Sequence, residues 1–234
     1  NISFINHNPS LMSELIVALD GMDPYKALEV AGDLSHLQPN GLWGFKIGHS
    51  LTFAGAEWIA ELKKLGKVFV DLKLYDIPNT VENNVGWLSS LNIDLATLHL
   101  SMGRSTLEKI TDKGVGILGV SLLTSAIPDE CKRIYRGSTT ETLLQLFREA
   151  SESGITGVVC SPKDLHLLDQ IDPDRTLLRV CPGIRGSKDD AGDQKRTMTP
   201  AEAVSEGAHL LVVGRPIVER TDYLNATNLI LKRI

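Results

Sequence analysis

Sulfur chemistry has little support in this sequence. It contains only three cysteines, Cys131, Cys160 and Cys181, which are widely spaced and form no Cys-x-x-Cys pair. Such pairs are typical of zinc sites and redox motifs. Three cysteines cannot all pair within one chain, and free thiols are the rule in reducing compartments. We therefore expect three buried thiols that act as small hydrophobic groups, in a protein of the cytoplasm.

Long apolar runs and an excess of basic residues are also missing. No run approaches the ~18 apolar residues of a membrane span, and we expect no targeting leader before the first strand. The chain has 24 Lys and Arg against 29 Asp and Glu, a net charge of -5, whereas nucleic-acid-binding surfaces usually carry basic excess. We expect neither a membrane nor a nucleic acid as partner. An anionic small molecule is compatible with this charge, because the local field decides its binding.

Short β-branched runs alternate with longer segments of helical period along the whole chain. One such segment places Ala27, Val30, Ala31 and Leu34 on a single helix face. The candidate strands are Leu15–Leu19, Trp43–Ile47, Lys67–Lys73, Asp94–His99, Val115–Leu122, Gly157–Cys160, Thr176–Cys181 and His209–Gly214. This alternation is typical of parallel sheets with helices packed on them.

Two topologies fit eight strand–helix units, a closed barrel and an open doubly wound sheet. The length of 234 residues is close to the ~250 residues of a typical (β/α)₈ barrel. No glycine-rich dinucleotide turn follows the first strand, which disfavours the open sheet. No linker or second domain is visible. We predict one α/β domain over residues 1–234, a single (β/α)₈ TIM barrel.

Capping signals support the expected helix boundaries. Asp23-Pro24 and Ser161-Pro162 each combine an N-cap residue with proline at the first helical position. Thr199 followed by Glu202 is a capping box. Gly66 and Gly207 stand where helices should end.

The third expected strand carries two charged residues on one face. Its apolar residues at positions 68, 70, 72 and 74 share one face, so Asp71 and Lys73 share the other. The uniformly apolar face of a barrel strand packs against the helices. Asp71 and Lys73 should therefore point inward, near the carboxyl-end mouth where such barrels hold their active sites.

The same alternation places further charges at this mouth. Lys46 lies between the outward-facing Phe45 and Ile47, and Asp20 ends the first strand. Asp76 follows the third strand in the next loop. Consecutive strands are usually neighbours. We therefore expect five charged side chains to converge: Asp20, Lys46, Asp71, Lys73 and Asp76.

A lysine between two carboxylates keeps its proton and suits proton donation and charge stabilisation better than Schiff-base formation. A salt-bridge network that only plugs the barrel is the structural alternative. A Mg²⁺ site on Asp20, Asp71 and Asp76 is another, although Lys46 and Lys73 would repel the ion. His99, at the end of the fourth strand, is interpreted as a structural or supporting residue.

The segments after the last two strands suit a phosphate group. Gly214 would let the backbone approach closely, and Arg215 offers a planar fork of donors at a helix start. The long, charged, glycine-containing loop after the seventh strand predicts a lid around residues 183–198. Arg185 and Gln194 are its candidate phosphate ligands.

Five short segments stand out together, in order: Phe45–Gly48, Asp71–Thr80, Pro182–Arg185, Ala191–Gln194 and Val213–Ile217. They closely resemble the orotidine 5′-phosphate decarboxylase family, and the likeness runs from Asp20 to Arg215. The Asp-x-Lys-x-x-Asp core alone is shared with related barrels, but Ile-Pro-Asn-Thr at 77–80 and Gly-Asp-Gln at 192–194 make it specific. The family often has Phe-His in place of Leu74-Tyr75, and His-Ala-x-Gly-Gly in place of residues 99–103.

The resemblance implies conversion of orotidine 5′-monophosphate to uridine 5′-monophosphate and CO₂ in pyrimidine biosynthesis, with no metal or cofactor. It makes Lys73 the acid that protonates C6 of the base and puts Asp71 against the departing carboxylate. Lys46 and Asp20 would contact ribose hydroxyls and complete the charge network. Thr124 would contact the pyrimidine, and Arg185, Gln194, Gly214 and Arg215 would hold the phosphate.

The resemblance also implies a homodimer with shared active sites. The residues that match Asp76 and Thr80 serve the neighbouring subunit's site in this family. The catalytic set it implies is Lys46, Asp71, Lys73 and Asp76. The substrate-binding set is Asp20, Lys46, Ile77, Thr80, Thr124, Arg185, Gln194, Gly214 and Arg215.

Two rival functions are open at this level. One is a sugar-phosphate decarboxylase or aldolase-like synthase on the same barrel, which would use Mg²⁺ and an enediolate. The other is a non-catalytic barrel that senses pyrimidine nucleotides, although a mere binder has no use for so costly a charge cluster.

Overall fold

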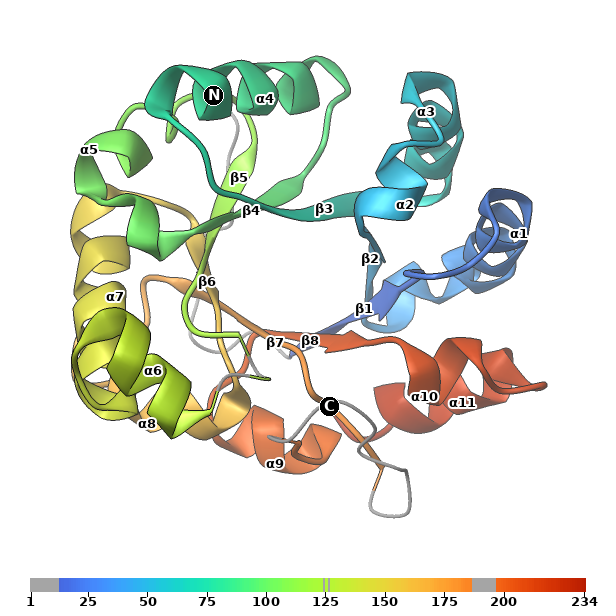
Figure 1. Ribbon diagram of the computed structural model, residues 1–234. Helices are drawn as coiled ribbons and strands as arrows, with labels where there is room; N and C mark the ends of the chain where they lie inside the picture. Colours follow the sequence, from blue (N-terminus) through green and yellow to red (C-terminus); the bar gives the residue numbers. More distant parts are fainter. Residues whose placement is uncertain (1–12, 124, 126, 187–196) are drawn as a thin grey trace.

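Eight parallel strands close into a barrel with the helices outside it (Figure 1), in a computed structural model that describes residues 13–123, 125, 127–186 and 197–234. Each strand pairs with the next, and β8 pairs with β1. The strands are β1 (Glu14–Ala18), β2 (Leu42–Ile47), β3 (Lys67–Leu74), β4 (Leu95–His99), β5 (Gly116–Val120), β6 (Gly157–Val159), β7 (Leu178–Cys181) and β8 (Leu210–Val213). The predicted (β/α)₈ barrel is confirmed.

The helices follow the strands around the outside of the barrel. Short 3₁₀ turns lie at Ser35–Asn40, Leu100–Met102 and Pro162–Asp164. The α-helices are α1 (Pro24–Leu34), α2 (His49–Thr52), α3 (Ala56–Leu65), α4 (Pro78–Ser90), α5 (Arg104–Leu107), α6 (Pro128–Tyr135), α7 (Thr139–Ser153), α8 (Leu165–Leu168), α9 (Pro200–Ser205), α10 (Arg215–Val218) and α11 (Tyr223–Leu231). None of these helices is long and apolar enough to cross a membrane.

Side chains alternate between the two faces of each strand, and this divides the apolar core into two layers. Leu15, Val17 and Phe45 belong to the large layer between strands and helices. Ile16 and Phe69 belong to a second cluster inside the barrel, with Leu118, Val180 and Val212 from other strands. Since side chains alternate across a strand, these two clusters show directly which residues face the barrel axis. They agree with the facing predicted for the second and third strands.

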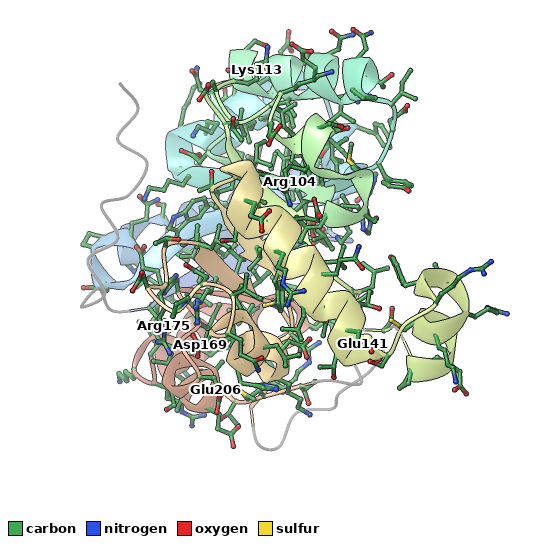
Figure 2. The ribbon with its side chains drawn as sticks, turned by 90° about the vertical axis from the view of Figure 1, so that its left-hand side faces the viewer. Arg104, Lys113, Glu141, Asp169, Arg175 and Glu206 are labelled. Atoms are coloured by element: carbon green, nitrogen blue, oxygen red, sulfur yellow. The ribbon has the colours of Figure 1, made fainter. Side chains whose placement is uncertain are left out.

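The predicted helix caps are present. Asp23 accepts hydrogen bonds from the backbone N–H groups of Tyr25 and Lys26, and Thr199 forms a capping box with Glu202. A second capping box, between Ser138 and Glu141, begins α7, the longest helix described. Glu141 is labelled at one end of α7 in Figure 2.

A buried arginine joins β7 to the segment after α8. Arg179 has no exposed surface, and its Nη1 donates to Asp169 Oδ1 at 2.6 Å. Asp169 also lies 3.3 Å from Arg175 Nε, and the two labelled side chains are close together in Figure 2. This network lies on the helix side of the strand, away from the barrel interior.

The cysteines behave as predicted. Cys131, Cys160 and Cys181 are all free and buried. Cys160 comes directly after β6, and Cys181 is the last residue of the neighbouring strand β7. Burial raises the pKa of the Cys181 thiol, so this thiol stays protonated and unreactive.

Candidate active site

Four charged side chains meet at the carboxyl ends of β1, β2 and β3: Lys46 of β2, Asp71 and Lys73 of β3, and Asp20, which follows β1 by two residues. Lys73 Nζ donates to Asp71 Oδ2 at 2.8 Å, and Lys46 Nζ lies 3.2 Å from the same oxygen. Lys46 Nζ also donates to Asp20 Oδ2. One carboxylate oxygen, Asp71 Oδ2, is therefore shared by two ammonium groups.

Attraction within this cluster outweighs the cost of burial. Burial alone acts to lower the pKa of Lys46, but the carboxylates of Asp71 and Asp20 hold that pKa above its usual range. For Asp71 burial acts to raise the pKa, yet Lys46, Lys73 and hydrogen bonds from Lys73 and Thr97 keep it below its usual range. Asp71 and Lys46 are therefore both charged at neutral pH.

Gly48 makes room for Asp20 in this cluster. A Cβ atom at position 48 would lie 2.2 Å from Asp20 Oδ1, far inside van der Waals contact. Any other residue would push the carboxylate away from Lys46. The segment Phe45–Gly48 marks this glycine in the sequence, but nothing in the sequence shows that its neighbour is Asp20.

Within one chain, two expectations about the charged residues were wrong: Asp76 does not join the cluster, and Lys73 does not lie between two carboxylates. Asp76 is exposed, its Oδ1 accepts a hydrogen bond from Ile77 N, and it is not among the described residues that line the cavity at the mouth. The chain turns outward here to begin α4. Lys73 is therefore paired with Asp71 alone among the described residues, and Lys46 is the lysine that lies between two carboxylates.

The charges line a cavity of about 640 Å³ at the mouth of the barrel. Apolar side chains such as Phe69, Val120 and Leu122 line it as well. A concave, mainly apolar site with a few convergent charged groups is the usual form of a small-molecule site.

Residues that follow β7 and β8 form another part of the wall of this cavity. Arg185 and Arg215 both line it, as does Gly214. Arg185 is buried and its Nη1 donates to the carbonyl oxygen of Ile184 at 2.8 Å, whereas Arg215 is exposed. A Cβ at Gly214 would meet Ala18 at 3.5 Å, an ordinary contact, so crowding does not require glycine there.

Two backbone hydrogen bonds join the two ends of the predicted lid, residues 183–185 and Met198. Arg185 N donates to Met198 O at 3.0 Å, and Met198 N donates to Gly183 O at 3.2 Å. The ends of the segment 183–198 are thus fixed beside the cavity. Most of the lid, including Gln194, lies outside the described residues, and so does Thr124.

A comparison with protein families matches residues 13–230 to "Orotidine 5'-phosphate decarboxylase / HUMPS family". The match covers the barrel from its first strand to its last helix. The chain belongs to this family. The predicted enzyme class, a carboxy-lyase, is confirmed with it.

Individual relatives agree with the family match. An orotidine 5'-phosphate decarboxylase of Rhodopseudomonas palustris (strain BisA53) is 41% identical over 225 residues, 94% of each chain. The protein of the same name from Dictyoglomus thermophilum is 39% identical and covers 89% of each chain. Among solved structures, orotidine 5'-phosphate decarboxylase from Lactobacillus acidophilus superposes with a TM-score of 0.78 at 32% identity, over 95% of this chain and 99% of that one.

Tyr75, a departure from the family pattern, contacts His99, which fits that pattern. The rings of Tyr75 and His99 meet edge to face, with centroids 5.8 Å apart. Burial and the charge of Lys73 hold the pKa of His99 below its usual range, so His99 is neutral near pH 7. Its contact with Tyr75 supports the interpretation of His99 as a packing residue at the edge of the site.

Sequence reasoning missed one residue of the cluster. Thr97, in the middle of β4, is buried and hydrogen-bonded to both Asp71 and Lys73. An inward-facing threonine at this position on the fourth strand was visible in the sequence. Its partners could not be predicted, because they depend on an irregularity in β3.

Proposed function

We propose that this enzyme converts orotidine 5′-monophosphate to uridine 5′-monophosphate and CO₂ in pyrimidine biosynthesis, without metal or cofactor and with Lys73 as proton donor. The observation that carries this proposal is the ammonium group of Lys73 in the mouth cavity, held 2.8 Å from Asp71. The family match supports the same reaction. We propose the cytoplasm as its location, on the basis of its three free thiols.

The reaction leaves an electron pair on carbon. As the bond between C6 and the carboxylate breaks, the pair stays on C6 and CO₂ departs. Lys73 supplies a fixed positive charge where this negative charge develops, which is the most effective stabilisation in a site that excludes water. The proton then passes from Lys73 Nζ to C6, and the amine regains a proton from solvent.

Asp71 and Lys46 prepare Lys73 for this step. Asp71 is only slightly exposed and keeps its negative charge, so it fixes the ammonium group in place. Its charge near the substrate carboxylate would also favour the loss of CO₂, since like charges repel. Lys46 and Asp20 extend the network toward the sugar.

The phosphate would bind at the wall formed by Arg185 and Arg215. Guanidinium groups hold phosphate oxygens through paired, charge-assisted hydrogen bonds. We propose that residues 183–198 close over the phosphate and that Gln194 joins the two arginines. We also propose that Thr124 contacts the pyrimidine. The fixed ends of the lid beside the cavity support this arrangement.

Chelation separates this function from the Mg²⁺-dependent rival. We expect loss of orotidine 5′-monophosphate, followed by its ultraviolet absorbance, to proceed at an unchanged rate in EDTA. The reason is that Lys46 and Lys73 already supply the positive charge that a metal would provide in the cavity. Activity that disappears in EDTA and returns with Mg²⁺ would favour the rival instead.

We also propose a homodimer in which Asp76 and Thr80 act in the partner's site. Asp76 is exposed between Tyr75 and Ile77, each with 66% of its surface exposed. Two large apolar side chains beside an exposed carboxylate are typical of an interaction surface. Ile77 would contact the partner's substrate together with Thr80.

Mixing two inactive variants tests the shared site. Asp76→Asn and Lys73→Ala should each be inactive alone. After random exchange of subunits, about half of the dimers contain one subunit of each variant, and one of the two sites in each mixed dimer is intact. The mixture should therefore regain about a quarter of the wild-type activity. The activity is measured after subunit exchange in mild denaturant. The control is each variant taken alone through the same exchange procedure. A mixture that stays inactive while mixed dimers form contradicts the shared site.

A further inference from the structure

The strand that carries both charged residues of the active site is irregular at that point. Val70 of β3 stands opposite Ala96 of β4, and Leu74 stands opposite Leu98. Three residues of β3, Asp71 to Lys73, therefore face a single residue of β4, which is Thr97. Such a bulge bends a strand and re-aims its side chains, and bulges are frequent beside active sites.

The bulge places Lys73 in a strained backbone conformation. Its φ angle is 48°, in the left-handed region that residues with a Cβ rarely adopt. Strain of this kind persists only where the surrounding structure holds it. The backbone N–H of Lys73 does not go to a carbonyl of β4 but donates to Thr97 Oγ1 at 2.9 Å.

The same hydroxyl group also orients Asp71. Thr97 Oγ1 donates to Asp71 Oδ1 at 2.8 Å, while Lys73 and Lys46 bind the other oxygen, Oδ2. The two oxygens thus have separate partners, and the plane of the carboxylate is fixed. Thr97 is only 1% exposed, so water cannot take over either hydrogen bond.

We propose that Thr97 is a positioning residue of the decarboxylation: its hydroxyl group joins both ends of the β3 bulge and holds Asp71 and Lys73 in their working geometry. This inference rests on the proposed function, because it concerns the same lysine and carboxylate. Thr97 itself acts through these two residues. It is not among the described residues that line the cavity.

Thr97→Val tests this role, since it keeps the β-branched shape and removes the hydroxyl. We expect kcat to fall roughly 10- to 100-fold, because small displacements of catalytic groups have effects of this size. KM should change little, while the melting temperature should fall by roughly 2 to 10 °C in Thr97→Val, because the buried N–H of Lys73 loses its acceptor. Thr97→Ser, which keeps the hydroxyl, should retain activity within about threefold of wild type.

Thr227→Val is the matched control. Thr227 is fully buried, and its hydroxyl donates only to the carbonyl oxygen of Tyr223, at 2.7 Å, within α11. We expect wild-type kcat from this variant. Should Thr97→Val not fold, Thr97→Ala removes the hydroxyl without adding a methyl group and gives the same comparison.

A second measurement reports on geometry without any turnover. In wild type the hydrogen bond from Thr97 helps to hold the pKa of Asp71 below its usual range. NMR titration of the ¹³C-labelled carboxyl group, assigned with Asp71→Asn, should show this pKa raised in Thr97→Val and unchanged in Thr97→Ser. A wild-type enzyme that leaves orotidine 5′-monophosphate intact would refute the proposed function, while this titration would still decide the role of Thr97.

Two results would overturn the inference. One is a Thr97→Val enzyme with the kcat of the Thr227→Val control. The other is a Thr97→Ser enzyme as slow as Thr97→Val, with the pKa of Asp71 equal in both and in wild type. Either would make Thr97 an ordinary packing residue of β4.

Discussion

Replacing Lys73 with alanine should lower kcat for orotidine 5′-monophosphate by about 10⁴-fold or more, because it removes both the proposed proton donor and the fixed positive charge. KM should change much less, since the proposed phosphate contacts follow β7 and β8 and not β3. In the closed barrel β3 and β7 are opposite each other (Figure 1). The measurement is steady-state turnover followed by ultraviolet absorbance.

The variant should still fold. Asp71 keeps Lys46 at 3.2 Å and the hydrogen bond from Thr97, so no unpaired buried carboxylate is left behind. Lys113→Ala is the control, because Lys113 pairs with Glu82 at 2.6 Å at the outer edge of the molecule (Figure 2). If Lys73→Ala kept more than about a tenth of wild-type kcat, Lys73 could not be the proton donor, since general acids contribute far more than that.

Much of the site could be predicted from the alternation of residues along strands. Lys46, between Phe45 and Ile47, had to face the barrel axis, and both neighbours do lie in the outer layer. The same reasoning placed Asp71 and Lys73 inward. It works because a barrel strand has only two faces, and an apolar face has to pack against helices.

The alternation of side chains along a strand could not predict the features of the site that depend on irregular backbone, which are the bulge in β3 and the position of Asp76. The bulge opposite Thr97 arises from strand register, which no single strand's pattern reveals. The place of Asp76 was predicted wrongly for a similar reason. It follows β3 by two residues, where the chain has already left the barrel to start α4, and strand geometry no longer applies.

Removal of the phosphate group from the substrate should lower kcat/KM by about 10⁵-fold, because the proposed phosphate site would then lose about three or four charge-assisted hydrogen bonds, at about 2 kcal/mol each. The effect should appear in kcat as well as in KM. Binding energy from a remote group offsets the cost of closing and desolvating the site. The measurement compares turnover of orotidine with that of orotidine 5′-monophosphate.

Arg215→Ala shows whether this loss arises at the predicted wall of the cavity. It should slow turnover of the phosphorylated substrate strongly but leave that of orotidine almost unchanged, and added guanidinium ion should recover part of the loss, since it fills the place of the missing side chain. Arg220→Ala is a control of the same type. Arg220 is a neighbouring exposed arginine and is not one of the described residues that line the mouth cavity.

Equal turnover of orotidine and its monophosphate by wild type would show that the phosphate adds nothing to catalysis. A defect of Arg215→Ala that is equal for both substrates would instead place the phosphate elsewhere, because an arginine that holds the phosphate can affect only the substrate that carries one.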